Sequence, residues 1–167
     1  MKGIILIILS LMFSSLSYSF EDICRAEDPT QWDDCHIFVN LGSEEGGIKD
    51  DIYVGEYKDG DLGGKGTLIS FDEKGRINEI YVGEFSEGLQ SGTGVLVGLL
   101  DGLVEEVYRG EWKDGSKEGY GIEVWVQDNE MYVGELKEDY WNGKGTLYSP
   151  EGEQTGIFKD DELILSK

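Results

Sequence analysis

One pattern of aromatic, apolar and glycine positions recurs four times along the chain. Each copy begins with a tyrosine, followed by a glycine two residues later, a glutamate at the third position and a large apolar residue at the fourth. Successive side chains of a strand point to opposite faces, so the second and fourth positions share the face of the tyrosine. The pattern therefore predicts one strand in each unit, beginning at Tyr53, Tyr81, Tyr108 and Tyr132.

A second glycine motif follows in each unit and predicts the partner strand. It is a Gly-x-Gly pair, found at Gly64 and Gly66, Gly92 and Gly94, Gly119 and Gly121, and Gly143 and Gly145. Glycine weakens a strand, so these residues indicate either close approach of a bulky group or a bend. We expect the rings of each repeat to lie over glycines of its own or the neighbouring hairpin, within a single-layer sheet.

The two strands of a unit also have an expected register. If Gly55 faces Gly66, the further opposed pairs are Tyr53 with Leu68, Tyr57 with Gly64, Glu56 with Lys65, and Glu135 with Lys144 in the last unit. The last two pairs would be cross-strand ion pairs on the face away from the rings. Turn residues separate the units, at Asp72-Glu73-Lys74-Gly75, Asp101-Gly102, Asp128-Asn129 and Pro150-Glu151-Gly152.

This arrangement of tyrosine, glycine, apolar residue and Gly-x-Gly resembles the MORN (membrane occupation and recognition nexus) repeat. The resemblance covers residues 53 to about 148 in four units. Leu136 and Asp139 depart from the pattern, which indicates that the terminal repeat is degenerate (worn). It implies an all-β fold: a single-layer antiparallel meander of β-hairpin repeats, elongated and twisted. Some members of the family carry a catalytic domain beside the array, and we expect none here.

The flanks of the array complete the expected domain organisation. Residues 35–41 could supply an opening strand, and Gly156 and Phe158 match the glycine and aromatic of a first strand although Gln154 replaces the tyrosine. We expect a signal peptide at 1–19, an N-terminal cap at 20–52, four repeats at 53–153 starting at 53, 81, 108 and 132, and a partial repeat with a C-terminal cap at 154–167.

The first residues are typical of a secretory signal. Lys2 precedes an apolar run from Ile4 to Phe13, and Ser17 and Ser19 supply small residues for cleavage after Ser19. The run is shorter than the roughly 20 residues of a membrane-spanning helix. An uncleaved anchor and a buried core helix are the alternatives. Cleavage predicts a protein that is exported to a periplasmic, extracellular or secretory-lumen compartment.

Export changes the meaning of the two cysteines, Cys24 and Cys35. In an oxidising compartment such a pair most often forms a disulfide, and this one would close the N-terminal cap. A lipid anchor on Cys24 is a weaker alternative because Asp22 and Ile23 are not the small residues it requires. A metal site with His36 is weaker still, because it has too few ligands at usable spacing.

The net charge of the chain limits the classes of molecule that it is expected to bind. Acidic residues outnumber basic ones 35 to 14, for a net charge of −21. A chain this acidic is repelled by nucleic acid and by anionic membranes, so we expect neither as a partner. The 39% hydrophobic and 11% aromatic content is nevertheless too high for a disordered acidic tail. A protein partner is expected, and self-association is left open.

The acidic residues do not form a recognisable catalytic or metal set. The glutamate of each unit recurs at a structural position, whereas a catalytic carboxylate acts beside a distinct partner in an unlike environment. The turns at Lys58 and Lys113 lack the twelve-residue spacing of a calcium-binding EF-hand, although weak calcium association stays open. We expect no enzyme activity, no cofactor and no metal site.

The aromatic series Tyr57, Phe85 and Trp112 is the candidate interaction surface. These rings are either the core of the sheet or an exposed platform, since repeat arrays present long continuous surfaces. The sequence thus predicts an exported, non-enzymatic scaffold or protein-interaction module. The alternative, suggested by the family, is a repeat protein that associates with membrane lipid.

Overall fold

The computed structural model describes residues 35–40 and 51–167, and the described part is built from strands. The strands are β1 (Cys35–Asn40), β2 (Ile52–Lys58), β3 (Asp61–Phe71), β4 (Ile77–Ser86), β5 (Leu89–Leu100), β6 (Leu103–Lys113), β7 (Ser116–Trp125), β8 (Glu130–Lys137), β9 (Tyr140–Ser149), β10 (Gly152–Lys159) and β11 (Glu162–Ser166). The predicted signal peptide and Cys24 lie outside the described residues, so cleavage and the disulfide stay predictions.

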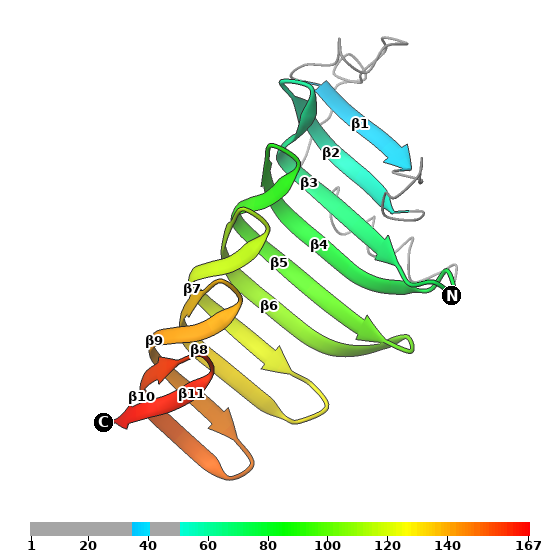
Figure 1. The fold of residues 1–167 in the computed structure, drawn as a ribbon. Coiled ribbons are helices and arrows are strands. Elements are labelled where there is room, and N and C mark those ends of the chain that lie inside the picture. The colour runs from blue at the N-terminus through cyan, green and yellow to red at the C-terminus, as the bar shows by residue number, and fades with distance from the viewer. Residues whose placement is uncertain (1–34, 41–50) are drawn as a thin grey trace, which may run out of the picture.

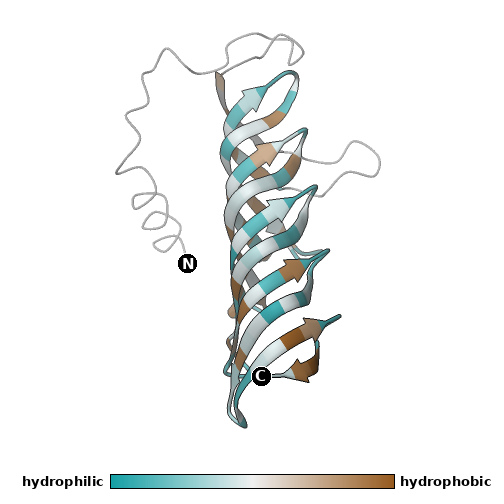
Figure 2. Ribbon diagram, turned by 90° about the vertical axis from the view of Figure 1, so that its left-hand side faces the viewer, coloured by the Kyte–Doolittle hydropathy of each residue, from teal (hydrophilic) through white to brown (hydrophobic). Residues whose placement is uncertain are grey.

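The strands form one sheet in sequence order, each antiparallel to the next. Figure 1 shows this meander as a single elongated layer that ascends from the C-terminal to the N-terminal hairpin. Seen from the side in Figure 2, the sheet is narrow and its hairpins curl over to one side. This confirms the expected fold class. Strands β1, β10 and β11 continue the sheet at the two flanks where partial units were expected.

Each repeat tyrosine lies over two glycines of its own hairpin. The four tyrosines are fully buried, and Gly55 pairs with Gly66 beneath the ring of Tyr53. A Cβ on Gly55 would lie only 2.6 Å from Cζ of that ring and 2.5 Å from the Cα of Gly66. The glycines are therefore needed for close packing, as the sequence predicted. Each tyrosine hydroxyl donates a hydrogen bond to the carbonyl of the fixed glutamate three residues later, at 2.9 to 3.0 Å.

The predicted register is right up to the glycine pair and wrong beyond it. Gly55 faces Gly66 and Tyr53 faces Leu68, but Tyr57 faces Leu62 and not Gly64. A bulge beyond the glycine pair adds two residues to the second strand of each unit, and Gly64 there adopts a φ of +67° that favours glycine. The first glycine of each Gly-x-Gly pair thus serves the bulge, whereas the second packs beneath the tyrosine.

The bulge also removes the expected ion pairs of the fixed glutamates with Lys65 and Lys144. In the last three units the glutamate carboxylates instead accept hydrogen bonds from backbone N–H groups of the bulge. Glu111 accepts from Tyr120 at 3.0 Å, and Glu135 accepts from the backbone N–H of Lys144 at 3.2 Å. In the second unit the Thr93 hydroxyl also donates to Glu84, at 2.8 Å. The repeated glutamate therefore stabilises the bulge, which explains its fixed position.

The hairpin turns within the units connect neighbouring repeats. Gly88 N donates to Leu62 O at 3.1 Å, and Asp139 N donates in the same way to Lys117 O at 3.1 Å. Asp139 replaces the glycine of the other units, adopts a φ of +71°, and accepts a further hydrogen bond from Lys117 N at 2.8 Å. The expectation that Asp139 marks a worn repeat is wrong, because its carboxylate adds a contact between the third and fourth units.

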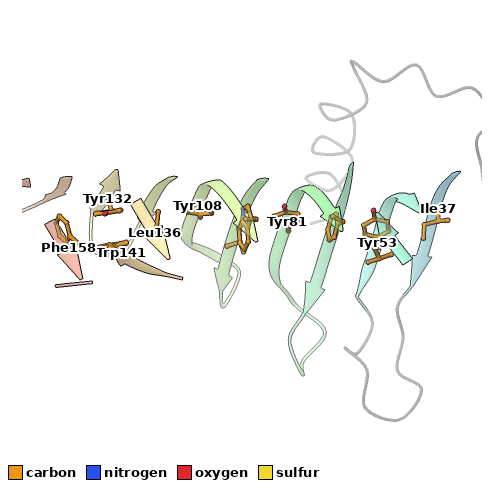
Figure 3. Packing of buried hydrophobic residues seen from close by; sticks show 12 residues of the cluster. Ile37, Tyr53, Tyr81, Tyr108, Tyr132, Leu136, Trp141 and Phe158 are labelled. Atoms are coloured by element: carbon orange, nitrogen blue, oxygen red, sulfur yellow. The ribbon is translucent and has the colours of Figure 1, made fainter. Parts of the chain in front are cut away.

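The core is a row of rings along the inner face, which we define as the face of the sheet that carries the four tyrosines (Figure 3). Phe85 lies edge-on between Tyr53 and Tyr81, with centroids 5.1 Å from each. Trp112 lies in the same way between Tyr81 and Tyr108, and this edge-to-face geometry suits aromatic rings. Phe85 and Trp112 thus each join two neighbouring units, whereas Tyr132 stacks on Trp141 of its own unit. The array is therefore stabilised by contacts between nearest neighbours, as expected for a repeat protein.

Candidate functional site

The three residues predicted as an interaction surface lie in or beside this core. Phe85 and Trp112 are only 5% and 6% exposed, because each lies between two repeat tyrosines. The interpretation of these two rings as an exposed platform is therefore wrong. Tyr57 is half-buried, packs against the core, and donates a hydrogen bond to Gly60 O at 2.6 Å. Burial, followed by the charge of Asp61, raises the pKa of its hydroxyl.

A polar cluster interrupts the core in the third unit. Lys117 is 9% exposed, and its ammonium group forms ion pairs with Glu106 and Glu123. The second oxygen of Glu123 accepts a hydrogen bond from the indole N–H of Trp141, in the next unit. The Lys117 ammonium also lies 5.3 Å from the centroid of the Tyr108 ring. These contacts satisfy charges that would otherwise be costly to bury.

Lys117 and Glu123 occupy positions that are mainly apolar in other units. Lys117 faces Trp112 as Leu62 faces Tyr57, and Glu123 lies between two repeat tyrosines as Leu68 does. The sequence therefore carried a signal for this cluster, a pair of charged residues at core positions of one unit, which the search for a unique polar set missed. The cluster lies within the packed row of rings, so it is a structural element of the array.

The pKa values of the residues in the cluster are shifted by burial and by the opposing charges. Burial raises the pKa of Glu106, and Lys117 opposes this rise. Burial lowers the pKa of Lys117, but the two glutamates more than offset that effect and the net direction is upward. Lys117 is thus held charged, with two carboxylates competing for it. This distribution of charge stabilises a buried ion pair and provides no free base or nucleophile.

The outer face, opposite the tyrosines, carries a continuous apolar band. We define the outer apolar band as the residues directly before and after each repeat tyrosine together with their cross-strand partners. One of its rows runs across eight strands, through Val54, Thr67, Val82, Val95, Arg109, Ile122, Val133 and Thr146. None of these side chains is buried. The described strands contact mainly their sequence neighbours, and none is folded over this face.

A hollow of about 490 Å³ lies in this band over β4 to β7. Its floor includes the backbone of Gly94, Gly110 and Gly121, whose side-chain positions face the tyrosine rings of the inner face. Val82, Val95 and Ile122 supply apolar walls, Tyr120 is 56% exposed at one end, and Arg109 is the cation among the lining residues. Arg109 stands where the first, second and fourth units have valine, a difference that the sequence also displayed.

Within the described residues, no helix is long and apolar enough to cross a membrane. A comparison with curated proteins gives no match. The family model of the MORN repeat matches four segments, residues 53–73, 81–98, 108–129 and 132–154, which begin at the four repeat tyrosines. Together with the hairpin meander and the tyrosines packed over glycine pairs, these matches, which cover half of the chain, show that it belongs to the MORN-repeat family.

Proposed function

We propose that this chain is an exported, non-enzymatic protein-interaction module that binds a protein partner on its outer apolar band. The observation that supports this proposal most strongly is the contrast between the two faces. The rings of the inner face pack against one another, whereas none of the described strands covers the outer band. Large contiguous apolar surfaces on monomeric proteins mark interaction sites.

The aromatic and polar residues of the repeat also have structural partners. The tyrosines and glycines pack together, and the fixed glutamates of the last three units hold their bulges. The cluster around Lys117 is buried and internally paired. These assignments leave the outer band as the surface that is free to recognise another molecule, which favours binding over catalysis.

Lipid association is the second candidate, since an apolar sheet face could also contact a membrane. The net charge of −21 opposes approach to an anionic bilayer through long-range repulsion. Repulsion of this kind is screened by salt, with a decay length of about 8 Å at physiological ionic strength. Vesicle binding driven by apolar contact would therefore strengthen as salt is added, and this salt dependence distinguishes lipid association from protein binding.

The experiment captures partners from the exported fraction with the full chain as bait and then measures the purified complex by titration calorimetry. We expect saturable binding to one protein, lost in Ile122→Lys, which places a charge in the outer band. Leu103→Lys is the matched control, because Leu103 is 64% exposed at the start of β6, beside the β5–β6 turn and outside the lining of the hollow. It should bind like the wild type.

Vesicle co-sedimentation distinguishes the two candidates. Phosphatidylcholine and phosphatidylserine vesicles are tested between low and high salt. No sedimentation with either lipid, together with a saturable protein complex, supports the proposal. Sedimentation that increases with salt and is lost in Ile122→Lys, with no saturable protein partner, would replace the proposal by lipid association.

A further inference from the structure

We propose that the hollow around Arg109 recognises a single carboxylate flanked by apolar side chains, presented by an extended segment of a partner protein. This inference rests on the proposed function and specifies the chemistry of the partner. Its centre is a cation placed in a row that otherwise carries valine, isoleucine and threonine, next to Val95 and Ile122 on the adjoining strands.

Arg109 has no ion-pair partner among the described residues. The ion pairs of the described part join Arg76 to Asp72 and Asp101, and Lys117 to Glu106 and Glu123. The nearest acid on the same strand and face is Glu111, whose carboxylate accepts the backbone N–H of Tyr120 at 3.0 Å. The guanidinium of Arg109 is exposed and lines the hollow. Its donors are therefore available to a ligand.

The residues that line the walls of the hollow indicate which side chains should lie beside the carboxylate in the bound segment. Val82, Val95 and Ile122 would contact apolar side chains of the segment, and the ring of Tyr120 offers a flat, exposed surface at one end. The floor is glycine backbone that is already paired within the sheet. A ligand would therefore be recognised there by its fit to the hollow and not by new backbone hydrogen bonds. An extended segment with one carboxylate between apolar side chains matches this arrangement.

Charge decides between a carboxylate and a phosphate. A guanidinium binds either group with two parallel hydrogen bonds. Glu111 borders the hollow, and the chain has a net charge of −21, so each additional negative charge on the ligand is repelled. A single carboxylate in a neutral or basic segment gains the guanidinium contact with the least repulsion. Basic residues flanking the carboxylate would also be attracted by the surrounding acids.

The test is an NMR titration of the ¹⁵N-labelled full chain with two blocked peptides, acetyl-Val-Lys-Glu-Lys-Val-amide and its glutamine counterpart. In an extended peptide the glutamate and both valines share one face, and the two lysines point away. We expect the glutamate peptide to shift the backbone resonances of Val95, Arg109 and Ile122. Charge-assisted hydrogen bonds to a guanidinium contribute enough that the glutamine peptide should bind about tenfold more weakly. Arg109→Gln should reduce binding of the glutamate peptide by a similar factor, and Arg109→Lys should fall between.

Arg76→Gln is the matched control, since Arg76 is an exposed arginine already paired with Asp72 and Asp101, and it should leave peptide binding unchanged. Equal affinity for the two peptides, or equal affinity in Arg109→Gln, overturns the inference. So does inorganic phosphate that shifts the same resonances at lower concentration than the peptide. If the captured protein partner binds Arg109→Gln like the wild type but loses Ile122→Lys, the inference fails while the proposed function stands.

Discussion

Replacing Gly83 by alanine tests the packing of tyrosine over glycine with the smallest available change. The new Cβ would lie 2.6 Å from Cζ of Tyr81 and 2.7 Å from the Cα of Gly94, so the ring must leave its site. The ring would then lose the hydrogen bond to Glu84 O, about 1 kcal/mol, and its edge-to-face contacts with Phe85 and Trp112, about 1 kcal/mol each. Alanine recovers about 0.5–1 kcal/mol of backbone entropy. The expected net loss of stability is about 2–2.5 kcal/mol.

The assay is urea unfolding followed by circular dichroism, with Gly102→Ala as the control. Gly102 has a φ of +82° and no atom within 4 Å of its Cβ position, so alanine there costs only backbone strain, about 1 kcal/mol net. In a Tyr81→Leu background the Gly83→Ala change meets only the backbone of Gly94, so it should cost about 2 kcal/mol less than it does beside Tyr81, and this difference is the coupling expected in a double-mutant cycle. A Gly83→Ala cost no larger than that of Gly102→Ala, or an unchanged cost beside Leu, would refute the reasoning.

Three further predictions concern the buried cluster, the tyrosines and export. Lys117→Met leaves the buried carboxylate of Glu123 without its cation and should destabilise by about 3–5 kcal/mol in urea unfolding. Changing both residues to leucine, as in the first unit, should cost less than the single change, and a larger cost would contradict this account. Burial raises the pKa of Tyr132 to about 12, so the folded protein keeps a proton that the unfolded chain loses near pH 10. Stability should therefore be complete below about pH 10 and fall as pH rises to about 12, and a constant urea midpoint across this range would argue otherwise. Intact mass spectrometry of exported protein should show a chain that begins at Phe20 and is two hydrogens lighter than the dithiol; retention of Met1 or two free thiols would disprove this prediction.

The sequence predicted the repeat and the ring packing because both depend on side-chain alternation and size. A tyrosine and the glycine two residues later share one face of a strand, so the ring needs a second glycine opposite the first. The pairing of Gly55 with Gly66 meets this need. The register beyond the glycines could not be predicted in the same way. It depends on the positive φ of Gly64 and on backbone N–H groups left free by the bulge, and neither is visible as a side-chain pattern.

The candidate site was harder to predict for a related reason. An aromatic residue on a strand of a single-layer sheet can be core or surface, and it is the flanking repeat tyrosines that bury Phe85 and Trp112 on the inner face. The informative positions were departures from the repeat. Arg109 replaces a valine on the outer face, and Lys117 and Glu123 are charged at inner-face positions that are uncharged in the other units, so a comparison between units would have identified all three.

Hydroxyl-radical footprinting of the complex with its protein partner tests most directly whether the outer apolar band is the binding surface. Side chains of the band and of its hollow should be oxidised more slowly in the complex than in the free chain, above all the exposed Ile122 of the band and Tyr120 at the end of the hollow. Leu100 and Leu103, the exposed strand residues on either side of the β5–β6 turn, should be oxidised at the same rate in both. Unchanged oxidation of Tyr120 and Ile122, with protection at Leu100 and Leu103, would contradict the account and place the partner on the hairpin ends.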